Sequence, residues 1–185
     1  MSSFTQQKKQ SMTSEDIMKY FGDLNAELAA ENIRGELALV GGAVMCLVFK
    51  SREATIDVDA VFEPKMKLYE CAKKVAEKNG LNDGWLNDSV KGYISVSGEF
   101  KLFNEMSHIK IFSASAEYML AMKCLSSRTD NINEINDIKF LLSHLALADV
   151  EQAIEVITKF YPAKQFLPKT KYLLQELIEK GVHAP

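Results

Sequence analysis

The sequence is poor in the residues that mark disulfide-bonded or membrane-spanning chains. Among its 185 residues are three cysteines, four prolines and a single tryptophan. No apolar run approaches the ~20 residues of a membrane-spanning helix, and none follows Lys8 and Lys9 as in a signal peptide. We therefore expect a cytoplasmic protein with no membrane partner. Its cysteines, which form no CxxC pair, are expected to be buried, reduced thiols; they are Cys46, Cys71 and Cys124.

Neither sign of charge is in large excess. The 22 lysines and arginines stand against 25 aspartates and glutamates, which gives a formal net charge of −3. A chain of this charge has no general attraction for nucleic acid, so an RNA contact would need a local basic patch. We expect no recognition of a DNA sequence. Hydrophobic residues make up 47% of the chain, which is enough to bury a core and excludes disorder over most of its length.

The pattern along the chain predicts a sheet-bearing core followed by helices. Residues 1–12 are polar and are expected to form a flexible tail. Residues 13–113 are assigned to the core, which opens with an amphipathic helix capped by Thr13 or Ser14. Residues 114–185 are assigned to a helical C-terminal part packed on the core. The expected class is therefore α+β, with a small mixed sheet flanked by helices.

The most informative stretch is ELALVGGAVMCLVFKSREATIDVDAVFEP, residues 36–64. It predicts a buried strand over Leu37–Val40, a break at Gly41–Gly42 and a short apolar helix over Ala43–Phe49. A basic turn then leads into a second strand, expected over Thr55–Phe62.

Asp57 and Asp59 lie two residues apart on the second of these strands. Side chains alternate between the faces of a strand, so both carboxylates are expected on one face, ~7 Å apart along the chain. Two such acids repel each other unless a cation or a donor lies between them. Carboxylate oxygens are ligands that Mg²⁺ prefers, and Gly41 and Gly42 would let backbone N–H groups approach a phosphate. The stretch thus predicts a nucleotide-phosphate site with Mg²⁺ or Mn²⁺.

This arrangement resembles the core of the minimal nucleotidyltransferases, the polymerase-β-like superfamily. The resemblance is carried by a glycine pair after a strand and by the pattern Arg-x-x-Thr-x-Asp-x-Asp, that is, by Gly41, Gly42, Arg52, Thr55, Asp57 and Asp59. A later segment, EYMLAMKCLSSRTDNINEINDIKFLL, is similar to the helical segment of the AbiEii and MenT group. That group occurs in bacterial toxin–antitoxin and phage-defence systems. The chain also resembles a family of small bacterial nucleotidyltransferase-like proteins.

The resemblance implies an enzyme that transfers a nucleoside monophosphate from an NTP to a macromolecular hydroxyl, on a tRNA 3′ end or a protein. It also implies a cognate antitoxin as a partner. Asp57 and Asp59 would hold the metal, and Arg52 would contact the γ end of the NTP or the leaving pyrophosphate. Lys123 would contact phosphate, and Asp137 would hold Lys123 or serve the acceptor. The other nucleotide-binding residues implied are Gly41, Gly42 and Thr55, the last of which mainly shapes the start of the strand.

One part of the family's pattern is missing. Many polymerase-β-like enzymes carry a third carboxylate on a later strand, whereas the strand expected here at Ile109–Phe112 offers Lys110. Glu99 and Glu105 are possible substitutes; otherwise the role of base would pass to Asp137. A catalytically decayed nucleotide-binding or regulatory protein of the same fold stays open as an alternative, and so does a chain whose paired carboxylates only face solvent.

Four further features have both a structural and a functional interpretation. Trp85 is a buried anchor or an aromatic platform for a base. The lysines of a helix predicted over Lys65–Asn79 form a solvated face or a patch that meets RNA or phosphate. Lys123 extends from the edge of the core or contacts phosphate. Asp137, on the border of its helix's apolar stripe, is a structural partner of Lys123 or Arg128, or part of an active-site wall.

The remaining predictions concern single elements. Besides the strand at Ile109–Phe112, a strand is expected at Tyr93–Ser97. Ser115 and Asp149 should each cap a helix, and a last helix should follow Pro168.

Overall fold

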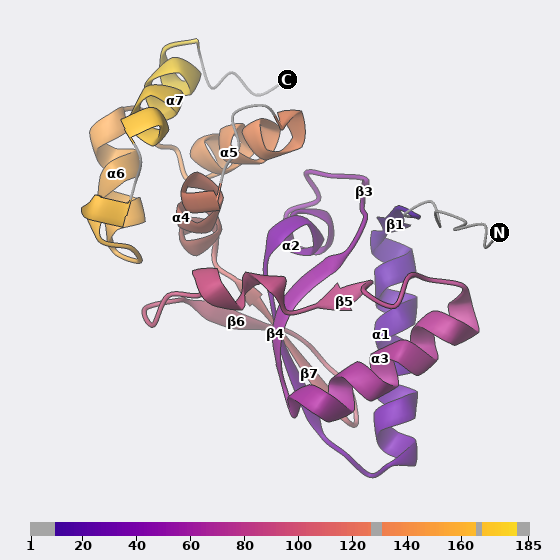
Figure 1. Ribbon diagram of the computed structural model, residues 1–185. Coiled ribbons are helices and arrows are strands. Elements are labelled where there is room, and N and C mark those ends of the chain that lie inside the picture. Colours follow the sequence, from indigo (N-terminus) through magenta and orange to yellow (C-terminus); the bar gives the residue numbers. More distant parts are fainter. Residues whose placement is uncertain (1–9, 127–130, 166–167, 181–185) are drawn as a thin grey trace, which may run out of the picture. The chain divides into compact units, whose positions relative to one another are not determined.

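The computed structural model describes residues 10–126, 131–165 and 168–180 (Figure 1). The chain divides into two compact units. The first comprises Met1–Val90 and Leu102–Ser113, and the second comprises Lys91–Lys101 and Ala114–Pro185. The described residues form helices, one mixed five-stranded sheet and one two-stranded sheet, so the expected α+β class is confirmed. In the part of the chain that the structure describes, no helix is both long and apolar enough to cross a membrane.

The elements alternate between strand and helix at first and are helical at the end. The first half contains β1 (Met12–Thr13), α1 (Ser14–Ala30), β2 (Gly35–Leu39), α2 (Gly41–Leu47), β3 (Ala54–Thr55), β4 (Val58–Glu63), α3 (Lys65–Asn79), β5 (Leu86–Asn87) and the 3₁₀ helix η1 (Ser89–Tyr93). The second half contains β6 (Phe100–Glu105), β7 (Ile109–Ala114), α4 (Ala116–Ser126), α5 (Ile132–His144), α6 (Val150–Thr158), the 3₁₀ helix η2 (Ala163–Gln165) and α7 (Pro168–Glu179). The predicted strand at Ile109–Phe112 and the predicted helix over Lys65–Asn79 are confirmed.

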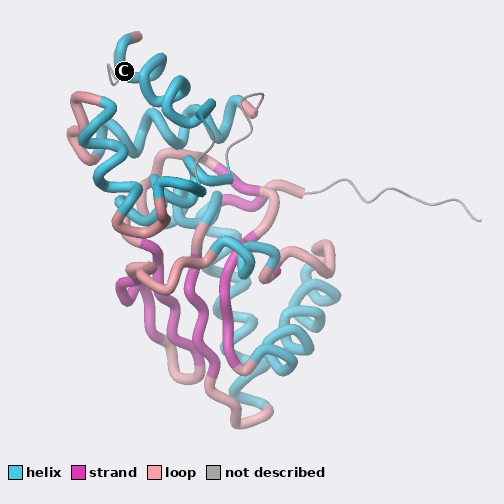
Figure 2. The backbone as a smooth tube through the Cα atoms, turned by 60° about the vertical axis from the view of Figure 1, so that its left-hand side comes forward, coloured by secondary structure: helices cyan, strands magenta, loops and turns pink. Residues whose placement is uncertain are grey.

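The main sheet has the strand order β5-β4-β2-β7-β6. Figure 2 draws the strands of the chain in magenta. Strand β2 pairs with β4 in antiparallel orientation and with β7 in parallel orientation. Strand β4 also pairs in parallel with the short β5, where Asp59 is opposite Asn87. Strand β4 is therefore hydrogen-bonded on both sides. A separate two-stranded sheet joins β1 to β3, with Met12 opposite Thr55.

The second predicted strand is wrong in one respect, because it is not continuous. The chain leaves one sheet after Thr55 and enters the other at Val58, since β3 pairs with β1 whereas β4 pairs with β2 and β5. Ile56 between them is half exposed, and the Thr55 hydroxyl donates a hydrogen bond to the carbonyl oxygen of Asp57 at 3.2 Å. Of the residues assigned to a flexible tail, Met12 is buried in β1, and residues 1–9 lie outside the described residues.

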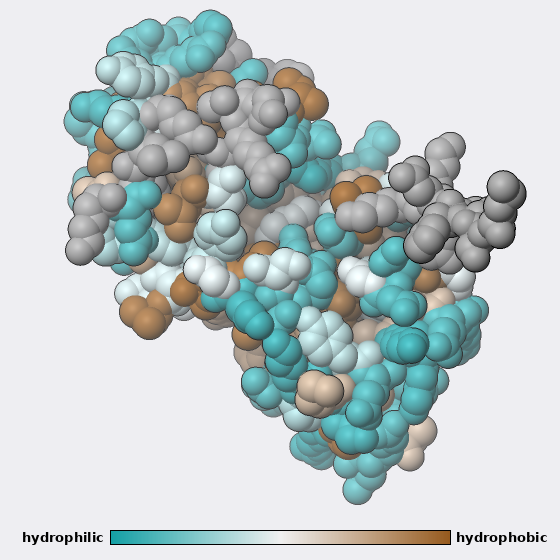
Figure 3. All heavy atoms as spheres, viewed as in Figure 1, coloured by the Kyte–Doolittle hydropathy of each residue, from teal (hydrophilic) through white to brown (hydrophobic). Residues whose placement is uncertain are grey.

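Helices α1 and α3 pack against each other in the first unit. Thr13 caps α1, as predicted, through a capping box with Asp16. Gly80 ends α3 in the left-handed conformation, with φ 67°. The lysines of α3 point to solvent, and four of them, Lys65, Lys67, Lys74 and Lys78, pair with acidic residues, Lys74 with Glu31 at 2.8 Å. Figure 3 shows a largely hydrophilic surface over α3, so the solvated-face interpretation accounts for these lysines.

Trp85 is a buried anchor between these helices. The residue is only 2% exposed, and its indole N–H donates a hydrogen bond to the carbonyl oxygen of Ala72 at 3.0 Å. Its ring meets that of Tyr20 edge-on, with centroids 5.7 Å apart. The buried-anchor interpretation is therefore right for most of this side chain.

The second unit is organised around the ring of Tyr118 on α4. That ring contacts the rings of Phe100, Phe160 and Tyr161, with centroids 5.5, 5.0 and 6.3 Å away. Ser115 caps α4, as predicted, because its hydroxyl accepts the N–H of Tyr118 at 3.2 Å. Aromatic packing and capping together fix the start of the helical part.

Two more single-element predictions can be compared with the second unit. Asp149 caps α6 through the N–H of Gln152 at 2.8 Å, as expected. The strand predicted at Tyr93–Ser97 is wrong. The chain there leaves a 3₁₀ helix at Tyr93 and turns, with the N–H of Gly98 donating to the carbonyl oxygen of Ser95 at 3.0 Å.

Candidate functional site

The predicted break at the glycine pair is the junction between β2 and α2. Strand β2 ends at Leu39, and the N–H of Val40 donates a hydrogen bond to the carbonyl oxygen of Asp59 at 3.0 Å. Helix α2 starts at Gly41, two residues earlier than predicted. Gly41 has φ 66°, a backbone conformation that residues with a Cβ atom rarely adopt. The turn thus requires glycine at this position.

Both glycines also leave room for side chains that approach from the β3–β4 segment. A Cβ atom on Gly41 would lie 2.9 Å from Oδ2 of Asp59. A Cβ atom on Gly42 would lie 2.5 Å from Oγ1 of Thr55 and 3.3 Å from Nη1 of Arg52. The structure therefore brings a carboxylate, a hydroxyl and a guanidinium against one turn of the backbone, in agreement with the set expected from the sequence.

Asp57 and Asp59 occupy the start of β4. Asp57 directly precedes the strand, and Asp59 alternates with the buried Val58 and Ala60, so its side chain leaves the opposite face of the sheet. Both aspartates are half-buried. Within the described residues, the Asp57 carboxylate makes no hydrogen bond or ion pair.

The chemistry of this pair suits a hard divalent cation. No group of three or more His, Cys, Asp or Glu residues that could hold a metal occurs in the described parts of the chain. Mg²⁺ at nucleotide sites is commonly held by one or two carboxylates, with substrate phosphates and water filling the remaining positions. Asp57 and Asp59 offer two carboxylates of this kind, whereas a structural metal held entirely by the protein would need more ligands.

Arg52 also lines an open hollow of about 540 Å³. Its other lining residues are Lys50, Ser51 and Glu53 from the same turn, and Thr13, Ser14 and Glu15 at the start of α1. Lys50 is exposed and has φ 56°. The turn between α2 and β3, which carries Lys50 and Arg52, is therefore tightly bent at Lys50. This places cationic side chains on the surface next to the glycine turn.

Lys123 and Asp137 form an ion pair inside the second unit. The Lys123 Nζ lies 2.8 Å from Oδ2 of Asp137, and the two side chains are 12% and 2% exposed. The prediction that Asp137 is a structural partner of Lys123 is confirmed. The border position expected from the helix is covered in the structure, because α4 packs against α5 and the carboxylate is buried. The other partner considered, Arg128, lies outside the described residues.

The position of the missing third carboxylate is occupied by a surface ion pair. Lys110 on β7 lies 3.2 Å from Glu105, and both side chains are about half exposed. The six residues from Gly41 to Asp59 lie in the first unit, and Lys123 and Asp137 lie in the second. The two sets of predicted site residues thus belong to different units.

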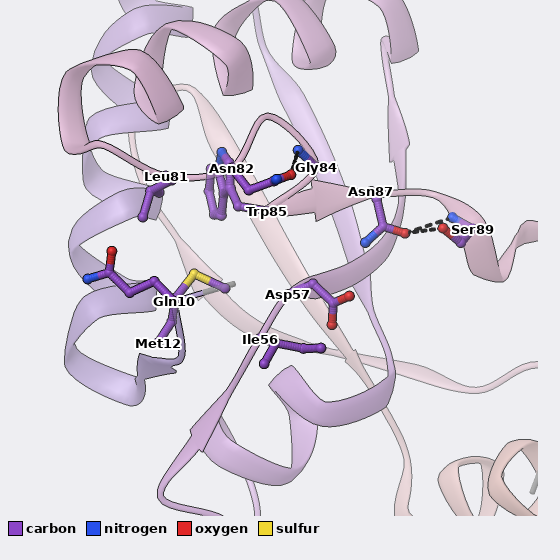
Figure 4. A pocket seen from close by; sticks show the side chains of 10 residues that line it. All are labelled: Gln10, Met12, Ile56, Asp57, Leu81, Asn82, Gly84, Trp85, Asn87 and Ser89. Carbon is purple, nitrogen blue, oxygen red and sulfur yellow. Dashed lines mark hydrogen bonds between the residues drawn. The ribbon is translucent and has the colours of Figure 1, made fainter. Parts of the chain in front are cut away.

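A cavity beside Asp57 was not predicted from the sequence (Figure 4). It has a volume of about 260 Å³. Its ten lining residues are Gln10, Met12, Ile56, Asp57, Leu81, Asn82, Gly84, Trp85, Asn87 and Ser89. The turn-rich segment around Trp85 was the only sequence signal for it, and the contribution of the N-terminal residues depends on the non-local pairing of β1 with β3.

No family model matches the chain, and no curated protein or solved structure matches it either.

Proposed function

We propose that this protein is a Mg²⁺-dependent nucleotidyltransferase, which transfers a nucleoside monophosphate from an NTP to a hydroxyl group of a macromolecule. The observation that supports this most is the approach of Asp59, Thr55 and Arg52 to the Gly41–Gly42 turn. An NTP needs its phosphates held close to backbone, its charge neutralised and its α-phosphorus oriented toward the attacking oxygen. The chain places groups for each of these tasks within one short segment.

The residues would divide these tasks by their chemistry. Asp57 and Asp59 would hold Mg²⁺, which supplies positive charge to the phosphates and to the leaving pyrophosphate. Arg52, with its planar fork of donors, would bind the end of the triphosphate. The glycines let the side chains of Asp59, Thr55 and Arg52 approach the turn, and the Thr55 hydroxyl holds the Asp57 backbone at the entry to β4.

The transfer itself needs little from the protein beyond positioning. The acceptor oxygen forms a bond to the α-phosphorus while the bond from that phosphorus to pyrophosphate breaks. The acceptor's proton leaves to water or to a carboxylate. The resemblance implies a tRNA 3′ end or a protein side chain as the acceptor. It also implies the biological setting of a toxin with a cognate antitoxin.

A second candidate is a nucleotide-binding protein of the same fold without catalytic activity. The observation that favours it is the Lys110–Glu105 ion pair on the strand where a third carboxylate would be expected. Such a protein would still bind an NTP through Asp57, Asp59 and Arg52. It would act through the bound state, as a regulatory partner.

The test is calorimetric titration with each of the four NTPs, in Mg²⁺ and in EDTA. We expect binding that requires metal and that is lost in Asp57→Asn and in Asp59→Asn. Glu36→Gln, at the opposite end of β2, is the control for loss of one negative charge. Absence of binding to every NTP would overturn both candidates. With binding established, transfer of label from an α-labelled NTP to RNA or protein in an extract separates the enzyme from the inactive binder.

A further inference from the structure

We propose that the cavity beside Asp57 is a binding pocket for the uncharged base of a nucleoside. The ligand class, a nucleoside, rests on the proposed function, whereas the kind of group that the pocket can bind follows from its lining residues. All ten lining residues belong to the first unit. None of them is lysine, arginine or histidine, and Asp57 is the only one that carries a charge.

This charge balance favours an uncharged occupant. A phosphate inside the cavity would meet no cation from the walls, and only metal held by Asp57 could offset its charge. The cations at the glycine turn, Arg52 and Lys50, line a different hollow. That hollow also has Glu15 and Glu53 in its lining, so its charges are mixed, whereas the cavity beside Asp57 has a single charged lining residue and suits an uncharged ligand.

Two side-chain amides supply hydrogen-bond donors to the pocket. The Oδ1 of Asn82 accepts the N–H of Gly84 at 2.8 Å, and the Oδ1 of Asn87 accepts the N–H of Ser89 at 3.0 Å. Because each oxygen is held by a backbone donor, each amide must turn its NH₂ group the other way. Figure 4 shows the nitrogen of Asn87 on the side of Asp57. Among the described residues, neither NH₂ group has an acceptor.

Buried apolar side chains form another part of the wall. Met12, Leu81 and Trp85 are all buried and form the part of the lining that is farthest from solvent. A flat ring with acceptor atoms on its edge would place its faces against these side chains and its edge toward the two amides. Donor groups on the ligand would find an acceptor in the Asp57 carboxylate. A nucleobase has all of these features.

The size of the cavity limits the occupant to a fragment of a substrate. Its volume of about 260 Å³ is below the ~300 Å³ at which pockets for whole drug-sized ligands begin. An entire NTP therefore does not fit, but a base does. Asn87 is also opposite Asp59 in the pairing of β5 with β4, so a base held here has its sugar close to the carboxylate pair.

The base can come from two sources with the same chemistry. It can belong to the NTP, or it can be the terminal nucleoside of an RNA acceptor. Competition separates these sources, because the NTP's own base and a free nucleoside cannot occupy the pocket together.

The fluorescence of Trp85 can report on this pocket, because Trp85 is the only tryptophan of the chain and lines the cavity. The experiment is titration of the full-length protein with adenosine, guanosine, cytidine and uridine, none of which carries phosphate, while the tryptophan emission is recorded. We expect at least one nucleoside to change the emission in a saturable way, with or without Mg²⁺. Asn82→Asp and Asn87→Asp keep the oxygen that holds the turn and remove the NH₂ donor, so each should raise the Kd about fivefold or more.

Asn131→Asp is a matched control. Asn131 makes the same turn, accepting the N–H of Asn133 at 3.0 Å, but it lies at the start of α5 in the second unit. This variant should leave the Kd unchanged, and thermal unfolding of all three variants checks that they are folded.

The outcomes separate the pocket from the proposed function. If no nucleoside changes the emission while Mg²⁺-dependent NTP binding is intact, the pocket inference is overturned and the proposed function stands. If a nucleoside binds but no NTP does, the pocket stands and the proposed function fails. Loss of the nucleoside response at saturating NTP assigns the pocket to the NTP base; retention of it assigns the pocket to the acceptor.

Discussion

The ammonium group of Lys123 lies 2.8 Å from the carboxylate of Asp137, and the two side chains are 12% and 2% exposed. They join α4 to α5 at a depth where an unpaired charge is costly. A lysine in an otherwise apolar helix segment thus has a structural role in the second unit, whatever contact it makes with a substrate.

Removal of the acid should destabilise this unit strongly. Asp137→Ala leaves the Lys123 ammonium without this carboxylate, so we expect the free energy of unfolding to fall by about 3–5 kcal/mol. Urea denaturation measures this. The double variant Lys123→Met/Asp137→Leu replaces the pair with apolar groups and should recover most of the loss. A fall of less than about 1 kcal/mol in the single variant would mean that the pair behaves as a solvated one.

Gly41 and Gly80 form a matched pair for testing the glycine turn. Both have positive φ, 66° and 67°, but a Cβ atom on Gly80 would meet nothing within 4 Å. Gly80→Ala should therefore cost only the strain of the left-handed conformation, about 1–2 kcal/mol. Gly41→Ala should cost more, because its Cβ would lie 2.9 Å from Asp59 Oδ2, and it should also abolish Mg²⁺-dependent NTP binding. Equal effects of the two variants on stability and binding would contradict this account.

The chain at Gly98 passes against the ring of Tyr118. A Cβ atom there would lie 2.7–2.9 Å from three atoms of the tyrosine side chain. Gly98→Ala should lower the free energy of unfolding by about 1–3 kcal/mol through overpacking. Gly92→Ala, where a Cβ would meet nothing within 4 Å, should stay within about 0.5 kcal/mol of the wild type. Thermal denaturation of both variants provides the comparison.

The contact between α1 and α3 should weaken in acid. The hydrogen bond from Lys78, helped by that from Asn79, holds the pKa of Asp23 below its ordinary value of 3.8. The unfolded chain therefore binds this proton more readily than the folded one, so the carboxylate stabilises the fold above pH 3.8 and the contribution disappears as the pH falls further.

Asp23→Asn tests this directly. Its Tm should be lower than that of the wild type at neutral pH, and the difference should shrink at about pH 3. The exposed Asp83→Asn is the control. A difference between Asp23→Asn and wild type that is constant across this range would show that the ion pair with Lys78 does not set the acid response.

The local parts of the fold could be predicted from the sequence. Helix α3 ends where Gly80 supplies a left-handed residue, and the glycine pair marks the junction of β2 with α2. Both depend on neighbours in the chain. The burial of Asp137 could not be predicted, because its helix alone places it on the border of the apolar stripe and only the packing of α4 covers it.

Non-local pairing explains the other differences. The chain breaks between β3 and β4 because Met12, far away in the sequence, pairs with Thr55. The segment predicted as a strand at Tyr93–Ser97 is held by the residues that follow α6 instead, because the Ser95 hydroxyl donates to the carbonyl oxygen of Phe160 at 2.6 Å. The cavity beside Asp57 could not be predicted for the same reason, because its lining residues come from segments that are far apart in the sequence.

The six residues around the glycine turn come from one continuous piece of chain, Gly41 to Asp59, closed by the antiparallel pairing of β2 with β4. In kinetic terms this is a region of low contact order, whereas the parallel pairing of Gly35 with Ile109 requires a long loop to close. We expect pulsed hydrogen exchange during refolding to protect the amide of Val40 before those of β7. The carboxylates and the turn would then meet early, and the rest of the sheet would form around them.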